Sequence, residues 1–372
     1  MSFMQGIILV ICVVISATSA QSSCYTPTGS RGQCMNMQDC KPIVQLLIKY
    51  GRSPPDHVDK FVRDSRCYDR GFGGDVRVCC ASTDNSISFS ERLTDSGGIN
   101  QRGLDLLDSL KCGIMSNFRI AGGTPVALGD FPWMALLRYE ANTKPFKCGG
   151  SLITHRHVIT AAHCVVKHQF NIVGVRLGEH DINTDPDCGR KGKRYVCMPP
   201  SENYGIEKIT AHPDYDSNTY LNDLAIITLD RTVNFNKHIK PICLPITPSS
   251  LVIARDQEYF IAGWGTTENG TTSPIPLKAK VPHRDNDYCT QTYRGLEIAR
   301  QQICVGGGSN IETCTGDSGG PLFFTATYRG TTSRYVQYGV VSLGGGGCGR
   351  VTYPGIYTNL KEFIPWITNV IA

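Results

Sequence analysis

Short apolar runs separated by turn-forming residues dominate the chain from about residue 120 to its end. Val173–Leu177, Leu224–Leu229 and Tyr338–Ser342 are examples, and Gly, Pro and Asn residues lie between such runs. Many short strands with turn signals between them predict an all-β barrel architecture. The final apolar stretch, Phe363–Ile367, is expected on a terminal helix. No long internal repeat and no coiled-coil heptads accompany this pattern.

The first twenty residues have a different texture. Met1–Ala20 contains no charged side chain, and its apolar run Ile7–Ile15 ends in the small residues Ala17–Ala20. This predicts a secretory signal peptide over residues 1–20, although its beginning lacks the usual positive charge. A short membrane anchor is the alternative, but the run is shorter than a comfortable bilayer span.

Composition narrows the class of protein. The chain has 372 residues, of which 41% are hydrophobic and 19% charged, so it can build a sizeable core and is expected to hold two or more domains. The formal net charge of +5 is spread along the chain without a basic block. We therefore expect no nucleic-acid partner and, once the signal is removed, no membrane association.

The number of cysteines, seventeen, says more about the class of protein than any other residue count. Without Cys12 of the signal, sixteen remain, and in an oxidising compartment they allow eight disulfides. The first six, which lie between Cys24 and Cys80, crowd into a segment too short for a large core, so disulfides must hold it together. Six cysteines allow fifteen pairings, and spacing does not choose among them. Between them, the run that begins at Lys41-Pro42 is expected to open a short helix.

A polar interval follows the cysteine cluster. Residues 81–98 are rich in Ser, Asp, Asn and Gly and are expected to form an exposed linker that is easily cut. We therefore divide the chain into a signal peptide (1–20), a cysteine-rich domain (24–80), a linker and activation segment (81–119), and a β-rich domain (120–372).

Three motifs in the β-rich domain carry candidate chemistry. Thr160–Cys164 places His163 among small residues, Asn222–Ile227 places Asp223 at the mouth of an apolar strand, and Gly316–Pro321 places Ser318 in a glycine-rich turn. A serine hydroxyl becomes a nucleophile when a histidine takes its proton, and a buried carboxylate can orient that histidine. Each motif met alone is more often structural: a solvent-facing histidine, a strand cap or a turn serine.

Together, and in the order His, Asp, Ser, these motifs resemble the chymotrypsin-type serine proteases over residues 120–372. The resemblance implies a double β-barrel in which His163 is the general base, Asp223 its orienting carboxylate and Ser318 the nucleophile. It also implies an oxyanion hole formed by the backbone N–H groups of Gly316 and Ser318. No catalytic metal is expected.

The same resemblance assigns the substrate pocket. Ser342 lies on the strand that would flank the substrate backbone, and Gly344 and Gly355 match positions that keep the pocket open. At the pocket floor, where trypsin-like members carry aspartate, this chain has Glu312. A carboxylate there implies cleavage after Arg or Lys, and its extra methylene is expected to crowd the pocket, with a preference for Lys or slower turnover. The alternative is that Glu312 turns aside.

Resemblance also implies an activation step. Cleavage after Arg119 would free the ammonium group of Ile120, which in the family inserts beside the aspartate that precedes the nucleophile, here Asp317. This order of events implies that the chain is made as an inactive zymogen.

The six-cysteine cluster resembles a clip domain of arthropod serine proteases, and the chain is similar to the easter and Grass type. The resemblance implies eight disulfides. They are Cys24–Cys79, Cys34–Cys67, Cys40–Cys80, Cys112–Cys243, Cys148–Cys164, Cys188–Cys197, Cys289–Cys304 and Cys314–Cys348.

Two accessory sites are expected. Glu179, Asp181, Thr184 and Asp187 lie within nine residues, and oxygen ligands at this spacing suit a structural Ca²⁺, which several relatives hold on the matching loop; a solvated acidic turn is the alternative. Asn269 opens a glycosylation sequon.

The expected function is that of a secreted serine endopeptidase in an extracellular cascade of the haemolymph, in innate immunity through Toll activation or melanisation. Its expected partners are an upstream activating protease, a downstream zymogen or cytokine precursor, and a serpin inhibitor. Alternatives are a catalytically weak homologue that acts as a cascade adaptor, a protease of a developmental cascade, and a digestive trypsin.

Overall fold

The computed structural model describes most of the chain. It covers residues 23–26, 31–50, 61–67, 76–80, 98–114, 124–141, 143–166, 171–191, 194–247, 250, 253, 257–267, 270–294, 296–307, 316–329, 332–344 and 353–372. Contacts divide the chain into an N-terminal unit, residues 1–88, and a C-terminal unit, residues 89–372. Several predictions lie outside the described residues. They concern the signal peptide, Arg119, Ile120, Asn269, Glu312 and the Cys314–Cys348 disulfide.

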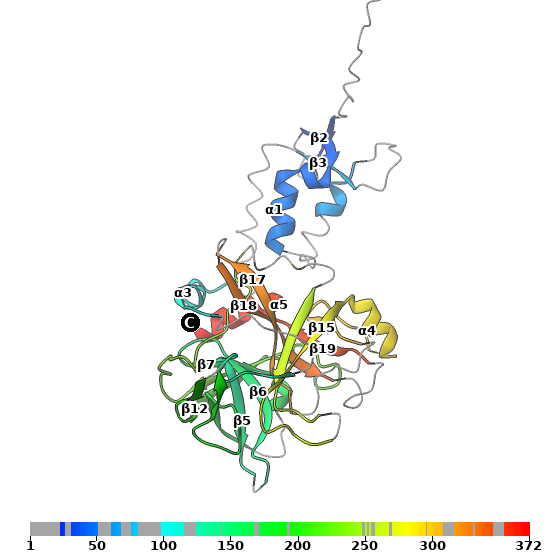
Figure 1. Ribbon diagram of the computed structural model, residues 1–372. Helices are drawn as coiled ribbons and strands as arrows, with labels where there is room; N and C mark the ends of the chain where they lie inside the picture. The colour runs from blue at the N-terminus through cyan, green and yellow to red at the C-terminus, as the bar shows by residue number, and fades with distance from the viewer. Residues whose placement is uncertain are drawn as a thin grey trace, which may run out of the picture. The chain divides into compact units, whose positions relative to one another are not determined.

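The described part of the N-terminal unit is a small antiparallel sheet with two helical segments, at residues 41–50 and 61–64. Its strands β1 (Ser23–Tyr25), β2 (Arg31–Asn36) and β3 (Arg77–Cys80) pair in the order β1-β2-β3, and α1 (Lys41–Tyr50) follows a 3₁₀ turn (Figure 1). The helix begins at Lys41 as expected, with Pro42 in its first turn, where a missing N–H costs no hydrogen bond.

The first sheet of the C-terminal unit carries two of the candidate site residues at its strand ends. Its strands are β5 (Met134–Tyr139), β6 (Phe146–Leu152), β7 (His157–Thr160), β8 (Ile172–Leu177), β11 (Glu202–Tyr204), β12 (Ile206–Ala211) and β13 (Ala225–Leu229). They pair in the order β11-β8-β5-β6-β7-β13-β12, all antiparallel. Among the described strands, the end strands β11 and β12 do not pair with each other, so the hydrogen-bond ladder of this barrel stays open.

The second sheet closes on itself. Its strands are β4 (Thr124–Pro125), β14 (Glu258–Gly263), β15 (Leu277–Arg284), β16 (Gln302–Val305), β17 (Pro321–Tyr328), β18 (Thr332–Leu343) and β19 (Gly355–Asn359). Their order is β14-β17-β18-β19-β16-β15-β4, and an additional pairing of β14 with β15 completes a ring. The two sheets together confirm the predicted double-barrel class, with one closed and one open barrel.

Aromatic packing joins the two sheets. Phe323 on β17 is fully buried and makes edge-on contacts with Phe131, Trp133 and Tyr335 at centroid distances of 5.0, 5.5 and 5.5 Å. Such edge-to-face pairs stabilise a core beyond the area that they bury. The cluster therefore holds the sheet of β5–β7 against the sheet of β17–β18.

Three α-helices lie in the described part of the C-terminal unit. They are α3 (Gln101–Ser109), α4 (Asn286–Thr292) and the terminal α5 (Leu360–Ile371), which confirms the predicted helix around Phe363–Ile367. Helix α3 packs on α5 (cyan beside red in Figure 1) and lies inside the interval expected as linker and activation segment. Among the described residues, no helix is long and apolar enough to cross a membrane.

Candidate active site

A buried carboxylate orients His163. Asp223 immediately precedes Leu224 and β13, and it is 0% exposed. Its Oδ2 atom lies 2.7 Å from His163 Nδ1, and its Oδ1 atom accepts a 2.8 Å hydrogen bond from the His163 backbone N–H. Because an ionised carboxylate only accepts, Nδ1 carries the proton and Nε2 keeps its lone pair. The His163 side chain is 21% exposed, so this lone pair can reach a substrate-side proton.

Two hydroxyl groups of the second sheet hold Asp223 from the other side. Ser342 Oγ donates to Asp223 Oδ2 at 2.5 Å, and Thr358 Oγ1 donates to the Asp223 backbone carbonyl at 2.6 Å. A buried carboxylate is tolerated when its oxygen atoms are hydrogen-bonded in this way. The orienting group is therefore fixed by both sheets.

A tight turn between Gly316 and Gly320 presents Ser318. The Ser318 backbone carbonyl accepts from Gly149 N–H at 2.8 Å, which ties the turn to β6. Gly319 has a φ of +78°, and a Cβ there would lie 2.2 Å from Thr160 Oγ1 and 2.5 Å from the Gly149 carbonyl oxygen. Only glycine fits this close approach, so the residue after Ser318 is dictated by the contact between the two sheets.

The backbone around Ser318 and the pair of His163 and Asp223 both lie at the seam where the two sheets meet. Between the described residues Ser318 and His163 the structure forms no hydrogen bond, as is common before a substrate is bound. His163 lies on a 3₁₀ turn, Ala162–Cys164, which the Cys148–Cys164 disulfide ties to β6. The arrangement supplies a base, its orienting carboxylate and a serine, which are the components of acyl transfer.

Asp317, next to the serine, packs against two glycines. Its Oδ1 atom accepts a 2.9 Å hydrogen bond from the Gly265 backbone N–H. A Cβ at Gly263 would lie 2.1 Å from that same oxygen atom, so the absence of side chains makes room for the carboxylate. Gly316, whose backbone N–H is expected in the oxyanion hole, has a φ of +103°, a conformation that L side chains rarely adopt.

Three of the four predicted pocket residues, Ser342, Gly344 and Gly355, are among the described residues. Ser342 lies on β18 and is engaged with Asp223 as described above, while Gly344 is exposed just beyond that strand. At Gly355, a Cβ would lie 2.9 Å from the ring of Tyr357, so the aromatic ring uses the space that the glycine leaves. Sequence reasoning did not assign Tyr357 a place at this wall.

Two further residues beside the site were missed by sequence reasoning. Tyr220 has a positive φ of 55°, and its ring lies edge-on to His163 at 6.1 Å. The buried Gln302 side chain donates to the backbone carbonyl groups of Thr219 and Tyr220, both at 3.4 Å. The position of Tyr220, three residues before Asp223, could have indicated that it lies near the site. Its positive φ could not be predicted from the residue type.

The four residues expected to hold Ca²⁺ form a partly buried loop. Glu179 and Asp187 are both buried. Burial, together with the neighbouring Asp187 charge, raises the pKa of Glu179. The Arg176 guanidinium, 3.0 Å from the Glu179 carboxylate, partly opposes this rise. Thr184 Oγ1 donates to Asp187 Oδ1 at 2.6 Å. Asp181 accepts from the Asn183 N–H instead. Two close buried carboxylates suit a cation, although in the described part of this loop no three acidic groups converge.

Among the described residues, one group of three ligand-type side chains does converge, at Cys148, His163 and Cys164. The two cysteines share a disulfide, so neither offers a thiolate to a metal.

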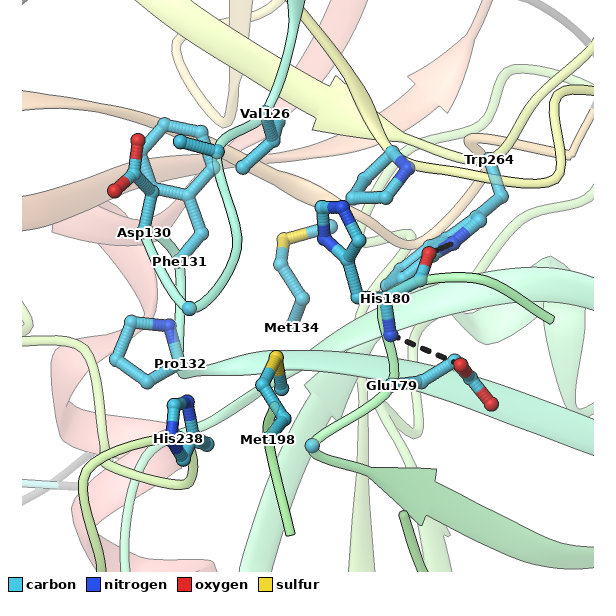
Figure 2. Close-up of a pocket in the computed structure, with 14 residues that line it drawn as sticks. Val126, Asp130, Phe131, Pro132, Met134, Glu179, His180, Met198, His238 and Trp264 are labelled. Atoms are coloured by element: carbon cyan, nitrogen blue, oxygen red, sulfur yellow. Dashed lines mark hydrogen bonds between the residues drawn. The ribbon is translucent and has the colours of Figure 1, made fainter. Parts of the chain in front are cut away.

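A separate pocket lies among Val126, Phe131, Met134, Met198, His238 and Trp264. Figure 2 shows the residues that line it, with His180 beside Trp264 and its backbone N–H donating to the Glu179 carboxylate. None of the expected catalytic residues lines it.

Seven disulfides lie among the described residues. They are Cys24–Cys79, Cys34–Cys67, Cys40–Cys80, Cys112–Cys243, Cys148–Cys164, Cys188–Cys197 and Cys289–Cys304. Each is a pair that the resemblance implied. Three of them hold the N-terminal unit, and the other four lie within the C-terminal unit.

A double barrel with a histidine, a buried aspartate and a serine at its seam defines a serine endopeptidase of the trypsin-like class. The family model described as Trypsin matches residues 120–367, and the model described as the regulatory CLIP domain of proteinases matches residues 24–80. The chain therefore belongs to the trypsin family, as a clip-domain serine protease.

Known relatives have the same organisation. The chain is 39% identical to "Serine protease grass" of Drosophila melanogaster, over 96% of this chain and 95% of that protein. It is 37% identical to "Phenoloxidase-activating factor 3" of Holotrichia diomphalia, over 97% of each. Among solved structures, it is similar to the crystal structure of the Drosophila Grass clip serine protease of the Toll pathway, with a TM-score of 0.66, 38% identity, and coverage of 94% of this chain and 97% of that one.

Proposed function

We propose that this protease is a secreted zymogen, activated by cleavage after Arg119, that cleaves other proteins after a basic residue in an extracellular immune cascade. The observation that carries the catalytic part is the hydrogen-bonded pair of His163 and buried Asp223, with Ser318 held across the seam by Gly149. The names of its relatives, which include a phenoloxidase-activating factor, support the cascade.

In the proposed reaction, His163 Nε2 takes the proton of the Ser318 hydroxyl as Oγ attacks the scissile carbonyl carbon. Asp223 holds the imidazolium that forms, and the N–H groups of Gly316 and Ser318 stabilise the oxyanion. His163 then donates the proton to the leaving amine. Water then attacks the acyl carbonyl carbon as His163 takes its proton, and His163 gives that proton to Ser318 Oγ as the bond to the second product breaks.

Activation is proposed to act through Asp317. Its carboxylate precedes the nucleophile and already accepts from Gly265 N–H. A new ammonium group at Ile120, freed by cleavage after Arg119, would form an ion pair with this half-buried carboxylate. The charge would then fix the turn that presents Gly316 and Ser318.

The test uses the full chain with its activation site replaced by the recognition sequence of a specific processing protease. The cut enzyme is assayed on Lys, Arg and Phe amide substrates. We expect turnover on the basic substrates, with Lys ahead of Arg because Glu312 is longer than aspartate, and none on Phe. The uncut chain should be at least about a hundredfold slower.

Ser318→Ala is the matched control, and we expect it to lose about 10⁴-fold or more in kcat while it is cut and folded normally. Absence of turnover from the correctly cut chain would instead favour the adaptor alternative. In the proposed cascade, an upstream protease cuts this chain, a zymogen or cytokine precursor is its substrate, and a serpin inhibits it.

The loop of Glu179 and Asp187 is proposed to bind Ca²⁺, through carboxylate and carbonyl oxygen atoms and with a structural role. Its two buried carboxylates support this proposal, because a divalent cation would offset their repulsion. Ca²⁺ should raise the melting temperature more than Mg²⁺ does. Glu179→Gln should abolish that rise, whereas the exposed Glu140→Gln should keep it.

A further inference from the structure

A separate β-hairpin forms a two-stranded sheet of its own in the C-terminal unit. Strands β9 (Cys188–Lys191) and β10 (Arg194–Cys197) form a two-stranded antiparallel sheet, and the Cys188–Cys197 disulfide closes its base. Below the disulfide, the Met198 backbone N–H donates to the Asp187 carbonyl at 2.7 Å, and both residues are buried. The hairpin is thus fixed at its base before any partner arrives, which lowers the entropy cost of binding.

The hairpin concentrates positive charge. The sequence places Arg190, Lys191, Lys193 and Arg194 within five positions. Arg190 and Arg194 are exposed, and neither guanidinium group forms an ion pair or hydrogen bond with any residue that the structure describes. Unpaired charges on an exposed element attract oppositely charged partners.

Nearby carboxylates do not neutralise these arginines. Asp187 accepts from the backbone N–H groups of His180 and Asp181 and from the Thr184 hydroxyl. Asp185 accepts from Ser201. The acidic loop next to the hairpin is therefore engaged with its own backbone, and the charge of the arginines is left for another molecule.

The register distributes the charges over both faces. Arg190 is paired with Tyr195, and Arg194 is paired with Lys191. Paired residues share a face and successive residues alternate, so Arg190 and Tyr195 lie on one face while Arg194 lies on the other. Tyr195 is 72% exposed. Arginine and tyrosine are enriched at protein–protein interfaces, which favours a protein over a polysaccharide as the partner.

The edges of this sheet are open. Among the described strands, neither β9 nor β10 pairs with a third strand, and a Cβ placed on Gly189 would meet nothing within 4 Å. An open edge presents backbone N–H and C=O groups that can pair with an added strand. Cations on such an edge repel basic strands and admit acidic ones.

We propose that the β9–β10 hairpin is a docking site for an extended acidic segment of a partner protein, which adds as a third strand. Because successive residues of the added strand face opposite sides, two adjacent acidic residues place one carboxylate on the face of Arg190 and the other on the face of Arg194. Recognition is therefore specific for neighbouring acidic residues, and it uses none of the catalytic residues.

The test measures binding of fluorescein-labelled eight-residue peptides to the full chain by fluorescence anisotropy at low ionic strength. One probe has two adjacent glutamates at its centre, between Thr and Val residues. Its isomer has the glutamates separated by one residue, and a third peptide has glutamine in their place. We expect the adjacent pair to bind at least about threefold more tightly than the isomer, and the glutamine peptide to show no binding.

Two double variants of equal charge separate the hairpin from the net charge. Arg190→Gln with Arg194→Gln should weaken binding about tenfold, because two charge-assisted contacts are lost. Lys208→Gln with Lys237→Gln removes two exposed cations elsewhere and should leave binding unchanged. Equal weakening by both pairs would overturn the proposal, as would tighter binding of a heparin oligosaccharide than of the adjacent-glutamate peptide.

A backbone-modified probe tests strand addition on the unaltered protein. Methylation of alternate amide nitrogen atoms removes donors along one edge of the peptide without changing its charge. We expect binding to be lost for one of the two methylation registers; retention in both would disprove the added strand. None of these measurements requires catalysis, so their failure is distinct from a failure of the proposed peptidase function.

Discussion

The N-terminal and C-terminal units reach a stable fold by different means. The described core of the N-terminal unit is the small cluster of Cys40, Ile43, Val62 and Val78, and three disulfides surround it. In the C-terminal unit, a continuous apolar cluster joins both sheets around buried rings such as Trp133 and Phe323.

The difference teaches where covalent bonds are needed. A unit of fewer than ninety residues with so few buried apolar side chains gains little from the hydrophobic effect, so cross-links must supply the rest. In the C-terminal unit the disulfides fix local features instead. Cys148–Cys164 holds the turn of His163, and Cys188–Cys197 closes a hairpin.

The largest expected effect is loss of the N-terminal fold when Cys40 and Cys80 are both changed to alanine. This bond closes a separation of 40 residues, which corresponds to about 4 kcal/mol of chain entropy. That is comparable to the whole stability of a small unit. Hydrogen exchange should show residues 31–50 unprotected, while the C-terminal unit keeps its protection.

A matched change in the C-terminal unit sharpens the contrast. Cys188→Ala with Cys197→Ala opens a separation of only 9 residues, about 2.6 kcal/mol, and the large core does not depend on it. Exchange should rise in the hairpin alone. If both double variants left their units equally protected, the claim that the N-terminal unit depends on cross-links would be wrong.

The next largest effect is expected in the aromatic core. Phe323→Ala should cost about 3–5 kcal/mol, because the ring leaves a cavity between the sheets. The substitution should also lower kcat, because Ser318 precedes a strand of one sheet and His163 follows a strand of the other, and the Phe323 ring holds these two sheets together. Denaturant unfolding of the C-terminal unit measures the first and amide hydrolysis the second. Val173→Ala, at a position 40% exposed, is the surface control and should change stability little.

Local sequence pattern predicted much of this fold. The apolar runs at Val173–Leu177 and Leu224–Leu229 are strands β8 and β13, because β-branched and leucine residues between turns fit a buried sheet. Helix α3 was not predicted, although Asn100 caps it by accepting from Arg102 N–H at 3.0 Å. The polar composition around it suggested a linker, and tertiary packing on α5 decided otherwise.

Site residues that lie in a local sequence motif could be predicted. Site residues that are brought together from distant segments of the chain could not. His163, Asp223 and Ser318 were found from three separate strings. Tyr220 and Gln302 were not, because one depends on a positive φ and the other on a contact across 82 residues. Such contacts are set by the closure of the sheets, which residue spacing does not reveal.

A smaller effect is expected where α3 joins the C-terminal unit. A Cβ at Gly103 would lie 2.0 Å from the Thr368 carbonyl oxygen, so α3 packs on α5 at backbone distance. Gly103→Ala should destabilise the unit by about 1–3 kcal/mol despite the better helix propensity of alanine. Gly189→Ala, which meets nothing, is the control. Exchange protection of residues 101–109 measures the difference, and unchanged protection would refute the close contact.

The smallest expected effect is a difference in how the stability of the two units depends on pH. Burial, together with the Arg156 charge, lowers the pKa of His157 to about 4 from an unperturbed 6.5, whereas the disulfides of the N-terminal unit do not titrate. The unfolded chain therefore binds the extra proton first, so stability of the C-terminal unit is full above pH 6.5 and falls as the pH drops toward 4. Between pH 7 and pH 5 the loss should be at most about 2 kcal/mol.

His157→Gln isolates that contribution, because glutamine can keep the hydrogen bond to Thr154 without titrating. Denaturant midpoints of the variant should change less between pH 7 and pH 5 than those of the parent. A variant with the same pH slope as the parent would assign the acid sensitivity to another group. Protection of residues 31–50 should stay constant over this range, since the cross-links that hold the N-terminal unit are indifferent to acid.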